Sequence, residues 1–145
     1  MRAPESLFLM ALAFYTTAIF SSWASRRLAR WMIVVFGLGL LADASGTIIL
    51  CGIGSRWIWT LHSIAGLAAL LIMTLHFVWA ALAAKNLGRW YALFHRCSIM
   101  AWSVWLLSFV TGIPASIGTR FFITMTIVVI VVPTTALARI FMKMR

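Results

Sequence analysis

The chain has 145 residues, of which 64% are hydrophobic and only 10% are charged. Soluble domains average closer to half apolar and a quarter charged, so this composition excludes an ordinary soluble domain and indicates an integral membrane protein. The formal net charge of +10 does not indicate nucleic-acid binding, because the basic residues are scattered between apolar runs and form no polar basic face.

Five apolar stretches are long enough to cross a bilayer. They lie at about Ser6–Ala24, Trp31–Ile53, Ile58–Ala83, Tyr91–Ala115 and Phe121–Phe141. The connections between them are short, and short connections make consecutive helices antiparallel neighbours. The sequence therefore predicts an all-α integral membrane helical bundle. It forms a single transmembrane domain over residues 1–145, with a four-helix core plus one further helix.

Basic residues flank one set of segment ends more often than the other. One side carries Arg26, Arg27, Arg30, Lys85, Arg89, Arg96, Arg139, Lys143 and Arg145, and the other carries Arg2, Arg56 and Arg120. Cytoplasmic loops are enriched in lysine and arginine, and five spans place the termini on opposite sides. We therefore expect a multi-pass protein of the bacterial inner membrane with a periplasmic N-terminus and a cytoplasmic C-terminus. The first apolar run is long for a signal peptide, so we interpret it as a retained span.

The second predicted span contains Asp43, the one acidic residue deep in an apolar segment. An isolated carboxylate is costly inside a membrane, so we expect Asp43 to be protonated, paired or facing a polar cavity. A structural hydrogen bond and a role in binding protons or a ligand are equally open from the sequence.

The third predicted span carries two histidines on nearly one face. His62 and His76 are fourteen residues apart, which is four helical turns less about 40°. Imidazole is the usual protein ligand of haem iron, and small residues let a flat macrocycle lie against a helix. A histidine that only hydrogen-bonds a neighbouring helix is the alternative for either position. The face between the two histidines includes Gly66, Ala69, Met73 and, beyond His76, Ala80.

The fourth predicted span brings in the third histidine, His95. It lies nine residues after Asn86 in the short link, and His76 lies ten residues before Asn86. In an antiparallel hairpin the two reach nearly the same depth, which predicts a bis-histidine pair on the iron of one haem b. Further along the same face stands Trp102, which either lines the cofactor pocket or packs in the core.

His62 has no partner histidine at its own depth, because the chain has only three. Met125 in the fifth predicted span lies at a comparable depth, and histidine–methionine ligation occurs in cytochromes. Methionine is also common as apolar filler. His62 thus marks a candidate second haem site, with Met125 as a candidate ligand, although we favour the role of apolar filler for that methionine.

Three blocks of the sequence, LADASGT, LHSIAGLAALLIMTLHFVWA and FHRCSIMAWSVWLLSFVTG, resemble the small bacterial HsmA-type membrane proteins. That family is linked to haem sensing and haem tolerance. The resemblance covers Leu41 to Gly112, about half of the chain, and implies a compact helical protein associated with haem. The matching elements are D-x-x-G-T at Asp43–Thr47, the His62/His76 helix with Trp79, and F-H-x-x-S-I with W-x-x-W over Phe94–Trp105.

The chain departs from that family pattern in two places. Met32 stands where the family tends to show a histidine near the start of the second span, and members usually have four spans. Loss of a third histidine argues against a metal-ion site and leaves a two-ligand haem site intact. The extra span is a candidate docking helix for another membrane protein.

The sequence as a whole favours a membrane protein that binds haem b. Two histidine ligands close both axial positions of the iron, which favours electron transfer to a quinone or a redox partner over oxygen chemistry. The alternatives are a haem-sensing or haem-tolerance protein without redox duty, and a structural accessory subunit with no cofactor. An electron-transfer or haem-binding subunit is expected more than a stand-alone enzyme.

Overall fold

The computed structural model describes residues 3–53, 60–85 and 89–111 of the chain. They form four α-helices: α1 (Ala3–Ser25), α2 (Arg30–Ile53), α3 (Leu61–Lys85) and α4 (Arg89–Thr111). All four are long and apolar enough to cross a membrane, which confirms the all-helical prediction for these segments. The predicted fifth span, Phe121–Phe141, and Met125 within it lie outside the described residues.

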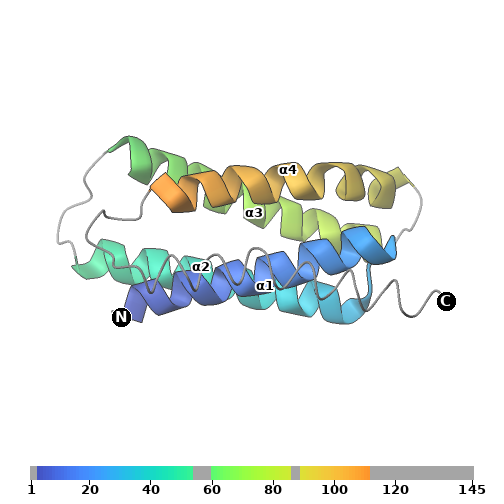
Figure 1. The fold of residues 1–145 in the computed structure, drawn as a ribbon, viewed down its shortest axis with the longest axis horizontal. Coiled ribbons are helices and arrows are strands. Elements are labelled where there is room, and N and C mark those ends of the chain that lie inside the picture. The colour runs from blue at the N-terminus through green and yellow to red at the C-terminus, as the bar shows by residue number, and fades with distance from the viewer. Residues whose placement is uncertain (1–2, 54–59, 86–88, 112–145) are drawn as a thin grey trace.

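The four helices form an antiparallel bundle (Figure 1). Contacts are densest between α1 and α2 and between α3 and α4, and the two pairs meet along a looser interface. The α1–α2 turn lies at the same end of the bundle as the end of α3 and the start of α4 (Figure 1). The start of α1, the end of α2 and the start of α3 lie at the other end (Figure 1).

Two helix ends show local signals that explain where the chain turns. Before α3, the Thr60 hydroxyl accepts a hydrogen bond from the Ser63 N–H at 3.1 Å, and the Ser63 hydroxyl accepts one from the Thr60 N–H at 2.8 Å. This reciprocal capping satisfies N–H groups that a helix start leaves open. After α1, Arg26 has a φ of 48°, a left-handed conformation that ends a helix.

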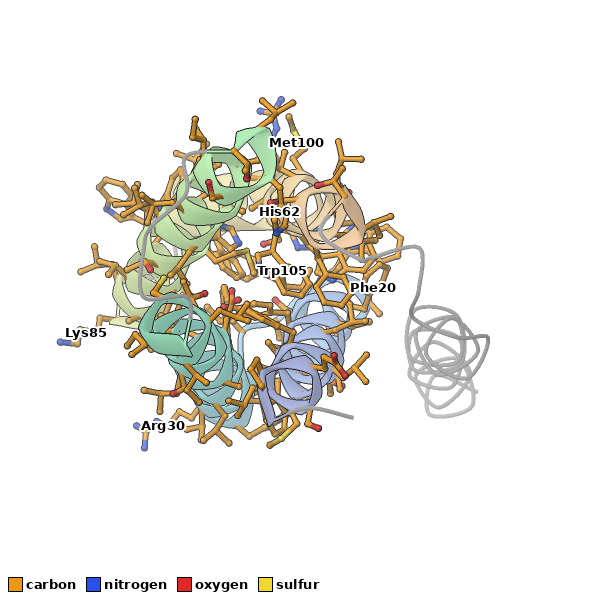
Figure 2. The ribbon with its side chains drawn as sticks, turned by 90° about the vertical axis from the view of Figure 1, so that its left-hand side faces the viewer. Phe20, Arg30, His62, Lys85, Met100 and Trp105 are labelled. Carbon is orange, nitrogen blue, oxygen red and sulfur yellow. The ribbon has the colours of Figure 1, made fainter. Side chains whose placement is uncertain are left out.

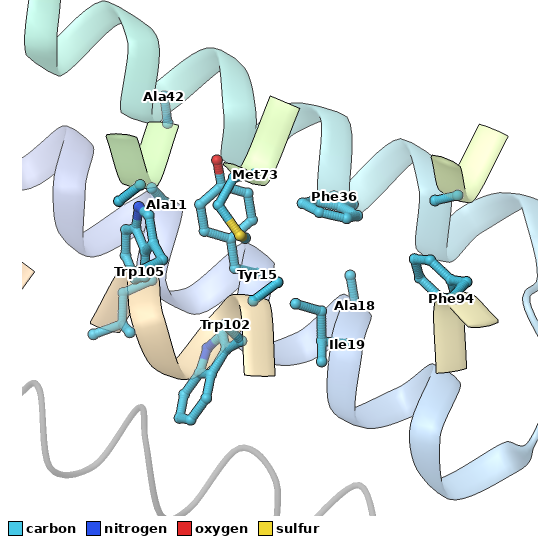
Figure 3. Packing of buried hydrophobic residues seen from close by; sticks show 14 of the residues in the cluster. Ala11, Tyr15, Ala18, Ile19, Phe36, Ala42, Met73, Phe94, Trp102 and Trp105 are labelled. Atoms are coloured by element: carbon cyan, nitrogen blue, oxygen red, sulfur yellow. The ribbon is translucent and has the colours of Figure 1, made fainter. Parts of the chain in front are cut away.

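The core of the bundle is built on aromatic contacts across helices (Figure 3). The Tyr15 ring meets Phe36 at 5.3 Å and Trp105 at 5.0 Å, both edge to face, so one tyrosine of α1 joins α2 and α4. Gly39 allows this close approach, because a Cβ atom there would lie 2.8 Å from Tyr15 Cδ1. The outward faces are apolar, as expected for helices surrounded by lipid.

Candidate functional site

The three histidines lie in very different surroundings. His76 is buried in the bundle with 3% of its surface exposed, His95 is half-buried, and His62 is exposed near the start of α3. Ionisable residues inside membrane helices generally mark a function, and His76 is the histidine that the fold encloses. His76 is therefore the centre of the candidate site.

The tautomer of His76 follows from its hydrogen bonds. His76 Nε2 lies 3.0 Å from Ser98 Oγ, and Ser98 Oγ lies 2.6 Å from the carbonyl oxygen of Phe94. A carbonyl can only accept, so the single hydroxyl hydrogen of Ser98 goes to Phe94. Ser98 must then accept from Nε2–H, which assigns the proton to Nε2 and leaves a lone pair on Nδ1. In the described part of the chain Nδ1 has no hydrogen-bond partner.

Aromatic rings hold the His76 imidazole in place. Phe94 stacks on it at 4.6 Å with 14° between the planes, and Phe36 meets it at 5.7 Å. Trp79, one turn further along α3, meets the imidazole edge to face at 6.4 Å. The indole N–H of Trp79 is buried and has no hydrogen-bond partner among the described residues.

An apolar cleft of about 330 Å³ lies between α3 and α4, with His76 in its wall. Leu75 and Met100 are each 69% exposed, and Figure 2 shows Met100 pointing away from the bundle, so the cleft opens toward the outside of the bundle. Pockets for small molecules begin near ~300 Å³ and are mostly apolar with a few polar groups. The lining consists of Ile72, Leu75, His76, Trp79, Cys97, Met100, Ala101 and Val104.

The contacts of the His76 imidazole and those of the His95 imidazole are made with different residues. His76 contacts Phe94 and Ser98, so it lies level with the α4 turn that contains His95. His95, however, is offset from the face shared by Phe94 and Ser98 by about 80° around the helix. Its ring stacks instead on Tyr91 at 5.9 Å. An iron held between the two histidines stays a prediction.

Trp102 faces α1 and lies outside the α3–α4 cleft. Its indole N–H donates to Thr16 Oγ1 at 3.2 Å, and its ring meets Phe20 edge to face at 5.1 Å. Of the two roles considered for Trp102, these contacts are those of a core residue that joins α4 to α1.

The predicted small-residue face of α3 points mostly into the bundle. Ala69, Met73 and Ala80 are buried together with His76, whereas Gly66 has open space where a side chain would stand. The buried alanines keep α3 close to its neighbours, which is also what ordinary membrane-helix packing requires. The described residues contain no group of three or more histidine, cysteine or acidic side chains that could hold a metal ion.

Asp43 is 4% exposed and paired by two donors from other helices. The Trp105 indole N–H donates to Asp43 Oδ2 at 2.7 Å, and the Tyr15 hydroxyl donates to the same oxygen at 3.3 Å. Figure 2 shows Trp105 pointing into the centre of the bundle. The carboxyl group thus ties α2 to α1 and α4, which is the hydrogen-bonding role considered for it from the sequence.

Sequence reasoning did not identify Ser98, Tyr15 or Trp105 as partners of the buried ionisable groups. A usable signal existed for two of them, because a buried carboxyl needs donors, and tyrosine and tryptophan supply a donor on an apolar body. Ser98 carried no comparable signal, because a serine in a membrane helix ordinarily bonds its own backbone.

The chain was compared with models of protein families, with curated proteins and with solved structures. None of these comparisons found a match. The chemistry of His76 and of the α3–α4 cleft is therefore the basis for assigning a function.

Proposed function

We propose that this protein binds a b-type haem within the membrane and that His76 is an axial ligand of the iron. The observation that carries the proposal is the hydrogen-bonded series from His76 Nε2–H to Ser98 to the Phe94 carbonyl. Histidines that bind a metal characteristically donate their second ring N–H to a neighbouring acceptor, which fixes both tautomer and ring orientation. His76 has this arrangement, with Nδ1 available to a metal.

The surroundings of His76 suit a flat, largely apolar cofactor. The cleft wall is apolar, and it includes the small side chain of Ala101. The Trp79 indole N–H in the same wall is a donor without a partner among the described residues, and it can serve an oxygen of the bound molecule. Bound haem supplies an iron whose ligation decides between electron transfer and binding of a sixth ligand.

The contacts support His76 as a ligand more directly than His95. A bis-histidine site requires His95 to leave Tyr91 and to turn by about 80° around the α4 axis. Single ligation by His76 suits haem sensing or haem tolerance, in keeping with the resemblance to HsmA-type proteins. Ligation by both histidines suits electron transfer to a quinone or a redox partner.

We further propose that the protein resides in the bacterial inner membrane with a periplasmic N-terminus and a cytoplasmic C-terminus. The support is the unequal distribution of basic residues along the chain, including Arg26, Arg27 and Arg30 beside the α1–α2 turn. The predicted fifth span would serve as a docking helix for another membrane protein.

The test of haem binding is a pyridine haemochrome assay on purified protein, with iron and protein counted in the same sample. We expect bound haem in the wild type, loss of haem in His76→Ala and retention in His62→Ala. His62 is the matched control because it is an exposed histidine of the same helix. A wild type without haem after expression with excess haem, or equal haem content in His76→Ala, would contradict the proposal. It would favour an accessory subunit whose histidines only pack.

A further inference from the structure

The end of the bundle that contains the α1–α2 turn is basic and has no acidic side chain to balance it. Arg26, Arg27, Arg30 and Lys85 are exposed there, and Figure 2 shows Arg30 and Lys85 reaching outward. The whole chain contains two acidic residues. Glu5 lies in the first turn of α1, at the other end, and Asp43 is buried between Tyr15 and Trp105. Neither acidic side chain therefore supplies a counter-charge at this end.

At this end of the bundle, a tyrosine hydroxyl that lacks a hydrogen-bond partner occurs together with an arginine. The Tyr91 hydroxyl oxygen at the start of α4 is buried and has no hydrogen-bond partner among the described residues. Arg26 lies in the turn after α1, at the same end of the bundle as the start of α4 (Figure 1), and its positive charge acts on this hydroxyl. His95 stacks on the Tyr91 ring at 5.9 Å with 25° between the planes, which holds the ring against α4. We refer to Arg26, Tyr91 and His95 as the basic cluster. Arg26 comes from the turn after α1 and the other two from α4, so this cluster lies at the junction of α1 and α4.

A buried hydroxyl without a partner is unfavourable, and native structures rarely leave one unsatisfied. A phosphate oxygen would remove this deficit, because it accepts a hydrogen bond from a hydroxyl and pairs with a guanidinium. The side-chain carboxylates of Glu5 and Asp43 cannot do so, since both lie elsewhere.

Exposed tryptophans indicate that this end of the bundle lies at the level of lipid headgroups. Trp23, Trp31 and Trp90 are exposed at the same end of the bundle. Exposed tryptophans of membrane proteins gather at the boundary between hydrocarbon and water, where the headgroup phosphates lie. Basic pockets between transmembrane helices are known to bind anionic headgroups.

We propose that the junction of α1 and α4 binds the phosphate of an anionic phospholipid, with Arg26 and Tyr91 as the residues that contact it. The Tyr91 hydroxyl donates to a phosphate oxygen, and Arg26 neutralises its charge. This site is separate from the α3–α4 cleft, whose lining includes neither Arg26 nor Tyr91.

The test measures lipid retention by native mass spectrometry of the full-length protein in detergent. The protein is exposed in parallel to phosphatidylglycerol, to phosphatidylcholine and to soluble glycerol phosphate. We expect phosphatidylglycerol to be retained about fivefold or more over phosphatidylcholine, the ratio that one basic contact contributes. Glycerol phosphate should neither bind nor displace the lipid at equal concentration. Displacement by glycerol phosphate would instead indicate a free-phosphate site and overturn the assignment to lipid.

Three variants locate the site. Tyr91→Phe removes one oxygen atom and keeps the ring on His95, and Arg26→Asn removes the charge with a residue that tolerates a left-handed conformation. Both should lose most of the preference for phosphatidylglycerol. Arg27→Asn, the adjacent exposed cation, is the control and should retain it. Undiminished preference in Tyr91→Phe would overturn the proposal, even if Arg26→Asn failed to fold. Equal losses in Arg26→Asn and Arg27→Asn would also overturn it, because diffuse charge attraction would then be sufficient.

Discussion

His76 of α3 and Ser98 of α4 form a buried hydrogen bond of 3.0 Å between the two helices that line the cleft. The Ser98 hydroxyl donates its hydrogen bond to the Phe94 carbonyl oxygen, so it can only accept from His76. The pair therefore has one consistent arrangement of donors and acceptors. This bond assigns the His76 tautomer and orients the ring on which the proposed haem site depends.

Replacing Ser98 by alanine should weaken both the fold and the site. The buried His76 N–H would lose its acceptor, which costs about 1–3 kcal/mol in the free energy of unfolding. The imidazole would also lose its fixed tautomer, so we expect weaker haem binding. Thermal unfolding in detergent and haem titration measure the two effects. Ser103→Ala, an exposed serine of the same helix, is the control and should leave both unchanged.

The three histidines should respond differently to replacement by alanine. We expect His76→Ala to lose haem, because its imidazole is the buried one in the cleft wall. His95→Ala should retain haem, because the His95 ring stacks on Tyr91. Optical spectra and low-temperature electron paramagnetic resonance at matched protein concentration measure these outcomes.

The same spectra decide between sensing and electron transfer. A low-spin wild-type spectrum that turns high-spin in His95→Ala would show that both histidines bind the iron. It would favour electron transfer and would show that α4 rearranges on haem binding. A spectrum lost only in His62→Ala would move the haem to the other end of α3 and make Met125 the next ligand to test.

Asp43→Asn should preserve the fold better than Asp43→Leu. Asparagine keeps an acceptor oxygen for Trp105 and Tyr15, whereas leucine leaves both donors buried without a partner. Each unsatisfied donor costs about 1–3 kcal/mol, so the leucine variant should unfold several degrees lower. Equal loss of folded protein in the two variants, measured after detergent extraction, would show that Asp43 has no structural hydrogen-bonding role.

Reporter fusions at both termini should give opposite results. The uneven distribution of basic residues predicts a periplasmic N-terminus, and five spans predict a cytoplasmic C-terminus. A reporter fused after Arg145 should therefore be active only if it works in the cytoplasm. Periplasmic activity at that position would contradict the orientation or the fifth span.

Much of the architecture could be predicted from the sequence because its causes are local. Whether a segment crosses a membrane depends on its own apolar length, and α1 to α4 appear where apolar runs of that length were found. The sequence also showed that Asp43 needs a partner, because the cost of an isolated carboxylate belongs to that residue and its depth. Depth itself follows from counting residues along neighbouring helices.

The direction in which each side chain points was decided by tertiary packing. The rotation of a helix about its axis depends on how side chains from several helices fit together. That rotation therefore cannot be obtained by counting residues along one helix. Packing placed Phe94 and Ser98 against His76 and turned His95 toward Tyr91. It also selected Trp105 and Tyr15 as partners of Asp43, because they are the donors that α4 and α1 bring to that carboxyl group.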